Sequence, residues 1–76
     1  MDKFDDLTIL LLHRLICKSL DEVLASSRRC ETYIRRGVDR YEKLAVFQAE
    51  ANILSDLRDQ LVYEIALRNL LKDFAL

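Results

Sequence analysis

His13 and Cys17 have a spacing that could suit metal ligands. Because they lie four positions apart, the imidazole and the thiol could share one helix face and bind the same transition-metal ion. A zinc site needs three or four such ligands, and the chain has no second histidine. The sequence therefore predicts no metal ion and no cofactor, with both side chains lying beside an apolar stripe.

Two pairs of carboxylates could in principle act as general acid and base. They are Asp5 with Asp6, and Asp56 with Asp59. Acid–base catalysis needs a cleft that raises one carboxyl pKa, and a chain of two helices offers none. A phosphate-binding loop is excluded as well, because the chain has one glycine. We therefore expect a protein that is not an enzyme and has no catalytic residue.

Composition narrows the fold to helices. The chain has 76 residues, of which 51% are hydrophobic and 33% are charged, with one glycine and no proline. Such a chain forms one domain at most, and this composition excludes disordered and turn-rich all-β classes. Its net charge of −1 gives no overall attraction to nucleic acid or to an anionic membrane.

Gly37 divides the chain into two predicted helices. Glycine tolerates the left-handed conformation that ends a helix, and two arginines precede it. Asp39 and Glu42 have the spacing of a capping box at the start of a second helix. We therefore predict a single all-α domain over residues 1–76, an antiparallel two-helix hairpin that resembles a coiled coil and associates with partner helices. Its segments are a helix over about 3–36, a corner at 37–38 and a helix over about 39–75.

The first predicted helix contains a second capping signature, Ser19 to Glu22, which would mark a break. No glycine or proline lies nearby, so continuity is favoured. Apolar and small residues recur at steps of three and four along both helices, which predicts the seam between them. In the first helix they are Ile9, Leu12, Ile16, Leu20, Val23, Ser27, Cys30 and Ile34, and in the second Leu44, Phe47, Ala51, Leu54, Leu61 and Ile65, with Leu57 alongside.

A second apolar stripe on each helix exceeds what one seam can cover. In an antiparallel hairpin both stripes lie at the open end, where the first helix begins and the second finishes. We predict that they contact a partner, because isolated soluble proteins avoid large apolar patches. The alternatives that remain open are a foreign partner and self-association into a helical bundle. The predicted partner-binding residues are Phe4, Leu7, Leu11, Leu15, Val62, Ala66, Leu70 and Phe74.

Six cations and three anions lie between Arg28 and Lys43, a net charge of +3 near the corner. A nucleic-acid-binding helical protein is therefore a minor alternative. The interleaved acids favour a solvated tip and no nucleic-acid partner.

Targeting signals and cysteine usage indicate a cytoplasmic protein. The acidic start of the chain is unlike a secretory signal, and the longest unbroken apolar run, residues 9–12, is too short to cross a membrane. Cys17 and Cys30 are 13 residues apart, about 20 Å on one helix, so they cannot form a disulfide. We expect reduced thiols and no membrane partner.

The whole outline resembles the small E-type (YscE/SsaE-like) subunits of the type III secretion needle co-chaperone pairs. The likeness lies mainly in residues 35–65, with the glycine corner, Tyr41, Phe47, Gln48 and Tyr63, and in the segment LLLH at 10–13. The two cysteines and the long apolar tail after residue 65 depart from it.

The resemblance implies a bacterial cytoplasmic co-chaperone without enzymatic activity. Its partner would be a larger helical-repeat chaperone of the tetratricopeptide (TPR) type. Together the pair would keep the needle subunit soluble before export.

Overall fold

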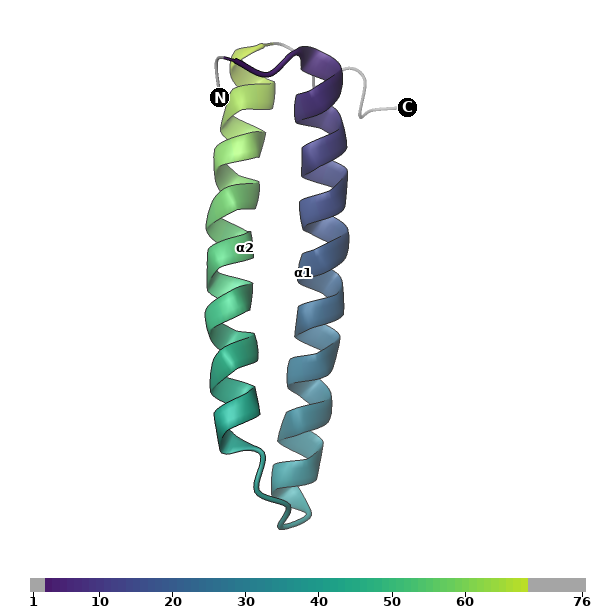
Figure 1. Ribbon diagram of the computed structural model, residues 1–76, viewed down its shortest axis with the longest axis vertical. Helices are drawn as coiled ribbons and strands as arrows, with labels where there is room; N and C mark the ends of the chain where they lie inside the picture. Colours follow the sequence, from purple (N-terminus) through teal and green to yellow (C-terminus); the bar gives the residue numbers. More distant parts are fainter. Residues whose placement is uncertain (1–2, 69–76) are drawn as a thin grey trace.

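The computed structural model describes residues 3–68 as two antiparallel helices packed side by side (Figure 1). Helix α1 spans Asp6–Arg35 and helix α2 spans Tyr41–Leu67. The predicted all-α hairpin is confirmed. The end of the second helix, which we placed at about residue 75, lies outside the described residues.

Helix α1 begins at a side-chain cap. Asp5 has an extended backbone, and its carboxylate accepts a hydrogen bond of 2.7 Å from the Thr8 backbone N–H. This N–H is one of the four that a helix start leaves without a partner. Because Asp5 occupies the cap, α1 starts at Asp6, three residues later than predicted. Its hydrogen bonds with Thr8 lower the pKa of the Asp5 carboxyl.

Helix α1 runs without a break through Ser19 and Glu22, as predicted. Both side chains are exposed, and the backbone around them stays helical. A capping signature ends a helix only where the backbone can leave it, and no glycine or proline is present here to favour that.

Gly37 closes α1 with a positive φ of 86°. The Gly37 N–H donates to the Ile34 carbonyl at 3.0 Å, and the Val38 N–H donates to the Tyr33 carbonyl at 2.9 Å. These two bonds form a Schellman motif, which satisfies carbonyls at the end of the helix. The corner was predicted correctly at Gly37, although the connection extends from Arg36 to Arg40 instead of covering residues 37–38 alone.

The predicted capping box of the second helix is wrong. The N-cap of α2 is Arg40, which makes no side-chain capping bond. Asp39 lies one residue too early, so its carboxylate reaches only the Tyr41 N–H, at 3.4 Å. Within the described residues, no hydrogen bond returns from Glu42 to complete the box. The Schellman motif explains the shift. Its hydrogen bond from the Val38 N–H to the Tyr33 carbonyl keeps Val38 at the end of α1, so α2 starts further along the chain than predicted.

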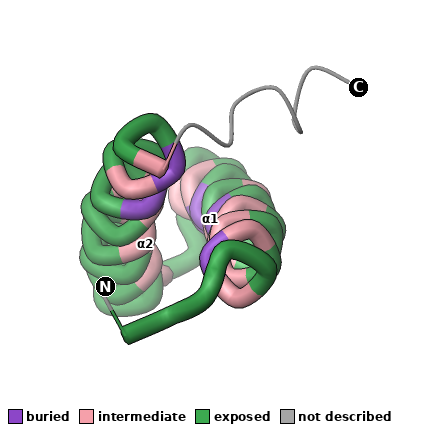
Figure 2. Tube along the Cα trace, turned by 90° about the horizontal axis from the view of Figure 1, so that it is seen from above, coloured by how far each residue is buried: buried purple, intermediate pink, exposed green. Residues whose placement is uncertain are grey.

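The core follows the predicted seam closely. Buried residues line the facing sides of the two helices in Figure 2. The central cluster joins Ile9 to Leu61 and Ile65 near the open end. Toward the corner the buried seam residues of α1 are the smaller Ser27 and Cys30. Every predicted seam residue is buried or half-buried, and Leu57, placed alongside, is the exception at 36% exposure.

Replacing Gly37 by alanine tests the corner. A Cβ built at this position meets no atom within 4 Å, so the cost of the substitution is the left-handed backbone alone. We expect Gly37→Ala to lower the free energy of unfolding by about 1–2 kcal/mol in urea titration. Gly37→Asn should cost less, because asparagine tolerates this conformation better. Equal stability of the alanine variant and the original chain would contradict the assignment.

The cap at Asp5 predicts a pH dependence. Its pKa is lower in the folded chain than in the unfolded chain, so its contribution to stability is present at neutral pH. That contribution is lost as the pH falls below about 4, through the folded-state pKa. Between pH 5 and pH 2 the original chain should therefore lose more stability than Asp5→Asn, as measured by thermal unfolding. Identical losses in the two proteins would show that the carboxylate does not act as the cap.

Candidate functional site

The hairpin has two broad faces, one on each side of the plane that contains the two helix axes. Successive residues of a helix are rotated by about 100°. In antiparallel helices, the residues that precede a seam residue by one position turn to the same side on both helices. We call this side face A. Its apolar members on α1 are Leu11 and Leu15. On α2 they are Val46, Ile53 and Leu57, and Leu57 belongs to this face because it precedes the half-buried Arg58.

The opposite side, face B, carries the residues that follow a seam residue by one position. On α1 these include His13 and Cys17, and on α2 they include Val62 and Ala66. A hollow near the corner supports the assignment of the faces. It is lined from α1 by Ser26 and Tyr33 and from α2 by Lys43, each of which precedes a seam residue.

The predicted partner-binding residues are exposed where they are described. Leu7 is 75% exposed, and the same exposed class holds Phe4, Leu11, Leu15, Val62 and Ala66. Leu70 and Phe74 lie outside the described residues. The role of these residues in binding stays a prediction.

The two predicted stripes do not form one surface. Leu11 and Leu15 lie on face A, whereas Val62 and Ala66 lie on face B. The described members of each stripe lie toward the open end. They are separated because Leu11 and Leu15 precede seam residues by one position, whereas Val62 and Ala66 follow seam residues by one position.

Sequence reasoning missed the apolar residues that α2 adds to face A. Val46 is 55% exposed and Ile53 is 61% exposed. Ile9 packs against Leu61 and Ile65. Two residues of α1 and α2 therefore lie at the same height along the hairpin when their residue numbers add to about 72. Leu15 is therefore level with Leu57. The missed signal was the spacing of seven and then four residues from Val46 to Ile53 and Leu57.

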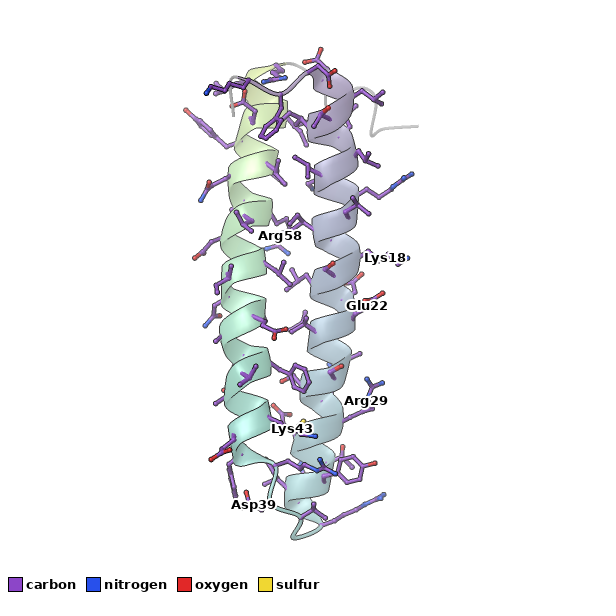
Figure 3. All side chains as sticks on the ribbon, in the orientation of Figure 1. Lys18, Glu22, Arg29, Asp39, Lys43 and Arg58 are labelled. Atoms are coloured by element: carbon purple, nitrogen blue, oxygen red, sulfur yellow. The ribbon has the colours of Figure 1, made fainter. Side chains whose placement is uncertain are left out.

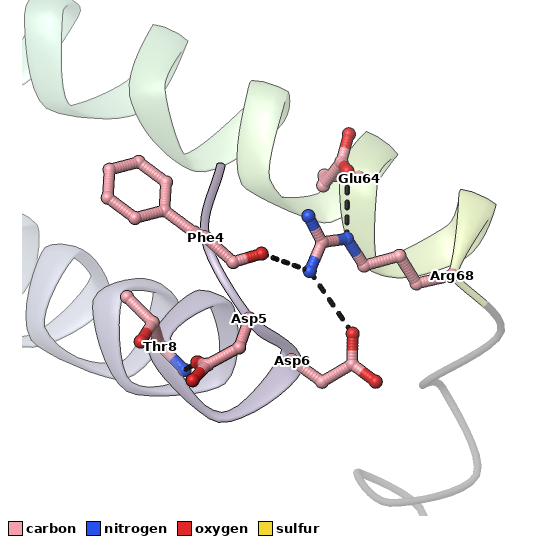
Figure 4. A network of polar contacts seen from close by, with 6 residues as sticks. All are labelled: Phe4, Asp5, Asp6, Thr8, Glu64 and Arg68. Atoms are coloured by element: carbon pink, nitrogen blue, oxygen red, sulfur yellow. Dashed lines mark hydrogen bonds and ion pairs between the residues drawn. The ribbon is translucent and has the colours of Figure 1, made fainter. Parts of the chain in front are cut away.

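An arginine ties the two chain segments together at the open end (Figure 4). Arg68 donates from Nη1 to the Phe4 carbonyl at 2.6 Å and to the Asp6 carboxylate at 3.1 Å. Its Nε donates to Glu64 at 2.8 Å. The hydrogen bond with Glu64 is the main cause that raises the pKa of Arg68. These contacts join the end of α2 to the extended segment that leads into α1, so they hold the two helices together at the open end.

The His13–Cys17 pair shares one side of α1 as the spacing predicts. The Cys17 sulfur lies 3.6 Å from His13 Nε2, and both side chains are half-buried. Within residues 3–68, no group of three metal-ligating side chains is present. Cys17 and Cys30 are both free thiols, and Cys30 is buried in the seam. Two potential ligands do not by themselves make a metal centre.

The cations near the corner divide between different sides of the hairpin. Arg29, Arg40 and Lys43 line the hollow on face A, while Arg28 follows the seam residue Ser27 and lies on face B. Figure 3 shows Arg29 and Lys43 on facing helices near the corner. These four cations are thus divided between two faces, which is unlike the continuous basic surface of most nucleic-acid-binding helices.

Comparison with protein-family models, curated proteins and solved structures finds no match to this chain. Neither of the described helices contains an apolar stretch that could span a bilayer.

Proposed function

We propose that this chain is a non-enzymatic co-chaperone or adaptor that stabilises a larger helical-repeat chaperone. By the resemblance drawn from its sequence, that partner is of the TPR type, and the pair helps to keep a type III secretion needle subunit soluble in the bacterial cytoplasm before export. The small subunit acts by covering its partner, so no direct contact with the needle subunit is proposed. It needs no cofactor.

The apolar part of face A is the observation that carries this proposal. Leu15, Ile53 and Leu57 lie at neighbouring levels on two helices that the Arg68 contacts hold together. Fully burying one leucine or isoleucine side chain is worth about 1.5–3 kcal/mol, and these residues are already partly covered. Several such side chains together would be the apolar anchors of a subunit contact. A helix in a groove, with a few apolar anchors, is the mode that this surface fits.

Charged substitutions on face A test the proposal. We expect Leu15→Asp together with Ile53→Asp to abolish co-purification with a tagged TPR-type needle chaperone, because two carboxylates would be desolvated at the contact. Ala45→Asp is the matched control, since Ala45 is exposed and follows a seam residue, so it faces the other side. Circular dichroism should show the same helical content in all variants. Full co-purification of the double variant would refute face A as the contact.

Self-association is the competing use of the same surface. Light scattering of the isolated chain at low micromolar concentration separates the two. A weak assembly that depends on concentration and dissolves when the chaperone is added agrees with the proposal. A stable dimer or tetramer that the chaperone does not dissociate would favour a structural or regulatory adaptor built as a homo-oligomer.

A further inference from the structure

The hollow on face A near the corner gathers positive charge without a matching acid. Three of its seven lining residues are cationic, and none is acidic; the seven are Ser26, Arg29, Cys30, Tyr33, Arg40, Lys43 and Phe47. Within the described residues, none of the three cations takes part in an ion pair. Like charges held close together repel, so this arrangement favours an anion that lies between them.

Arg40 is the most informative of these cations. Its Nε is buried and has no hydrogen-bond partner in the described chain. Its guanidinium lies over the Tyr33 ring, 5.4 Å from the centroid, which fixes its orientation. Arg29 donates to the Ser26 hydroxyl at 3.0 Å, so it too is held beside the hollow. The start of α2 adds the partial positive charge of its exposed N–H groups.

Two acids lie close to the same cations but do not line the face A hollow. Asp39 and Glu42 line a second hollow together with Arg40 and Lys43. Asp39 accepts from the Tyr41 N–H and makes no ion pair in the described chain. These acids reduce the charge of the corner as a whole, and therefore its attraction for a polyanion, without filling the face A hollow.

Face A continues from this hollow to the apolar patch. Val46 lies one turn of α2 from Lys43, and Ile53 lies ten residues from Lys43, about 15 Å along the helix. A partner helix laid along α2 on this face would meet Ile53, then the exposed Glu50 and Val46, then the hollow. On that partner helix, apolar residues at positions i and i+7 would contact Ile53 and Val46, and an acidic residue at about i+10 would reach the hollow.

We propose that the hollow formed by Arg29, Arg40 and Lys43 receives a carboxylate side chain of the partner helix that docks on face A. This inference rests on the proposed function, since it takes the element of the helical-repeat partner that contacts face A to be an amphipathic helix. Apolar anchors supply the affinity, and the carboxylate fixes the direction and register of the docked helix. A carboxylate fits better than a nucleic-acid backbone, because the adjoining surface is apolar and the chain carries a net charge of −1.

A pair of synthetic peptides tests the inference on the full chain. Both are amphipathic helices of roughly 18 residues. Both carry leucine at i and i+7, and they differ in having glutamate or glutamine at i+10 and i+11. Fluorescence anisotropy at about 50 mM salt should show the glutamate peptide binding about tenfold more tightly, with most of the difference lost at about 500 mM.

Two substitutions assign the difference to the hollow. Lys43→Glu should erase the preference for glutamate while leaving the affinity for the glutamine peptide unchanged. Arg40→Gln should reduce the preference without reversing it. The matched control is Arg28→Glu, which makes the same change of charge near the corner but on face B, and it should keep most of the preference.

Each other outcome overturns the inference in a recognisable way. Equal binding of the two peptides rejects the carboxylate site but leaves a partner on face A in place. If neither peptide binds, helix docking on this face is rejected. The proposed function is rejected as well if the chaperone still co-purifies with the variant that carries both Leu15→Asp and Ile53→Asp. A single-stranded oligonucleotide that binds more tightly than the glutamate peptide, and depends on Lys43, would assign the hollow to nucleic acid.

Discussion

Within residues 3–68, each helix of this hairpin has one neighbouring helix, and that geometric limit determines most of what these residues expose. One seam covers the residues at steps of three and four, and residues one position away are turned by about 100° into water. The run from Ile9 to Leu12 shows the effect directly. Ile9 is buried, Leu10 and Leu12 are half-buried, and Leu11 is 44% exposed. A sequence with four consecutive apolar residues in such a hairpin therefore leaves apolar surface uncovered.

The packing changes along the seam, and the surface chemistry changes with it. At the open end Ile9, Leu61 and Ile65 fill the seam with large side chains. Near the corner, Ser27 and Cys30 leave less apolar material to bury, and arginine and lysine side chains surround the thin core. Face A thus offers apolar contacts toward the open end and cationic contacts near the corner. A partner that follows this face has both a source of affinity and a source of orientation.

Periodicity predicted the seam, the corner and the continuity of α1, because each depends on local spacing and on one special glycine. It failed at the start of α2, where the backbone bonds of the Schellman motif set the boundary instead of the Asp39 side chain. It also placed Leu57 alongside the seam where the structure has Arg58. Arg58 is half-buried at the seam position of the periodic pattern, and its guanidinium reaches Ser55 at 3.3 Å and Asp59 at 3.4 Å. A scale that ranks arginine as polar cannot anticipate this.

The two stripes lie on opposite faces because one precedes the seam residues of α1 by one position, whereas the other follows the seam residues of α2 by one position. Counting apolar residues toward the open end correctly locates the surplus, but it cannot tell whether one surface or two will result. A single helix docked on face A would leave Val62 and Ala66 of face B in water. Covering both faces requires a partner that curves around the open end, and a concave array of helical repeats has that shape. The division of the surplus between two faces therefore favours an enclosing partner over a single added helix.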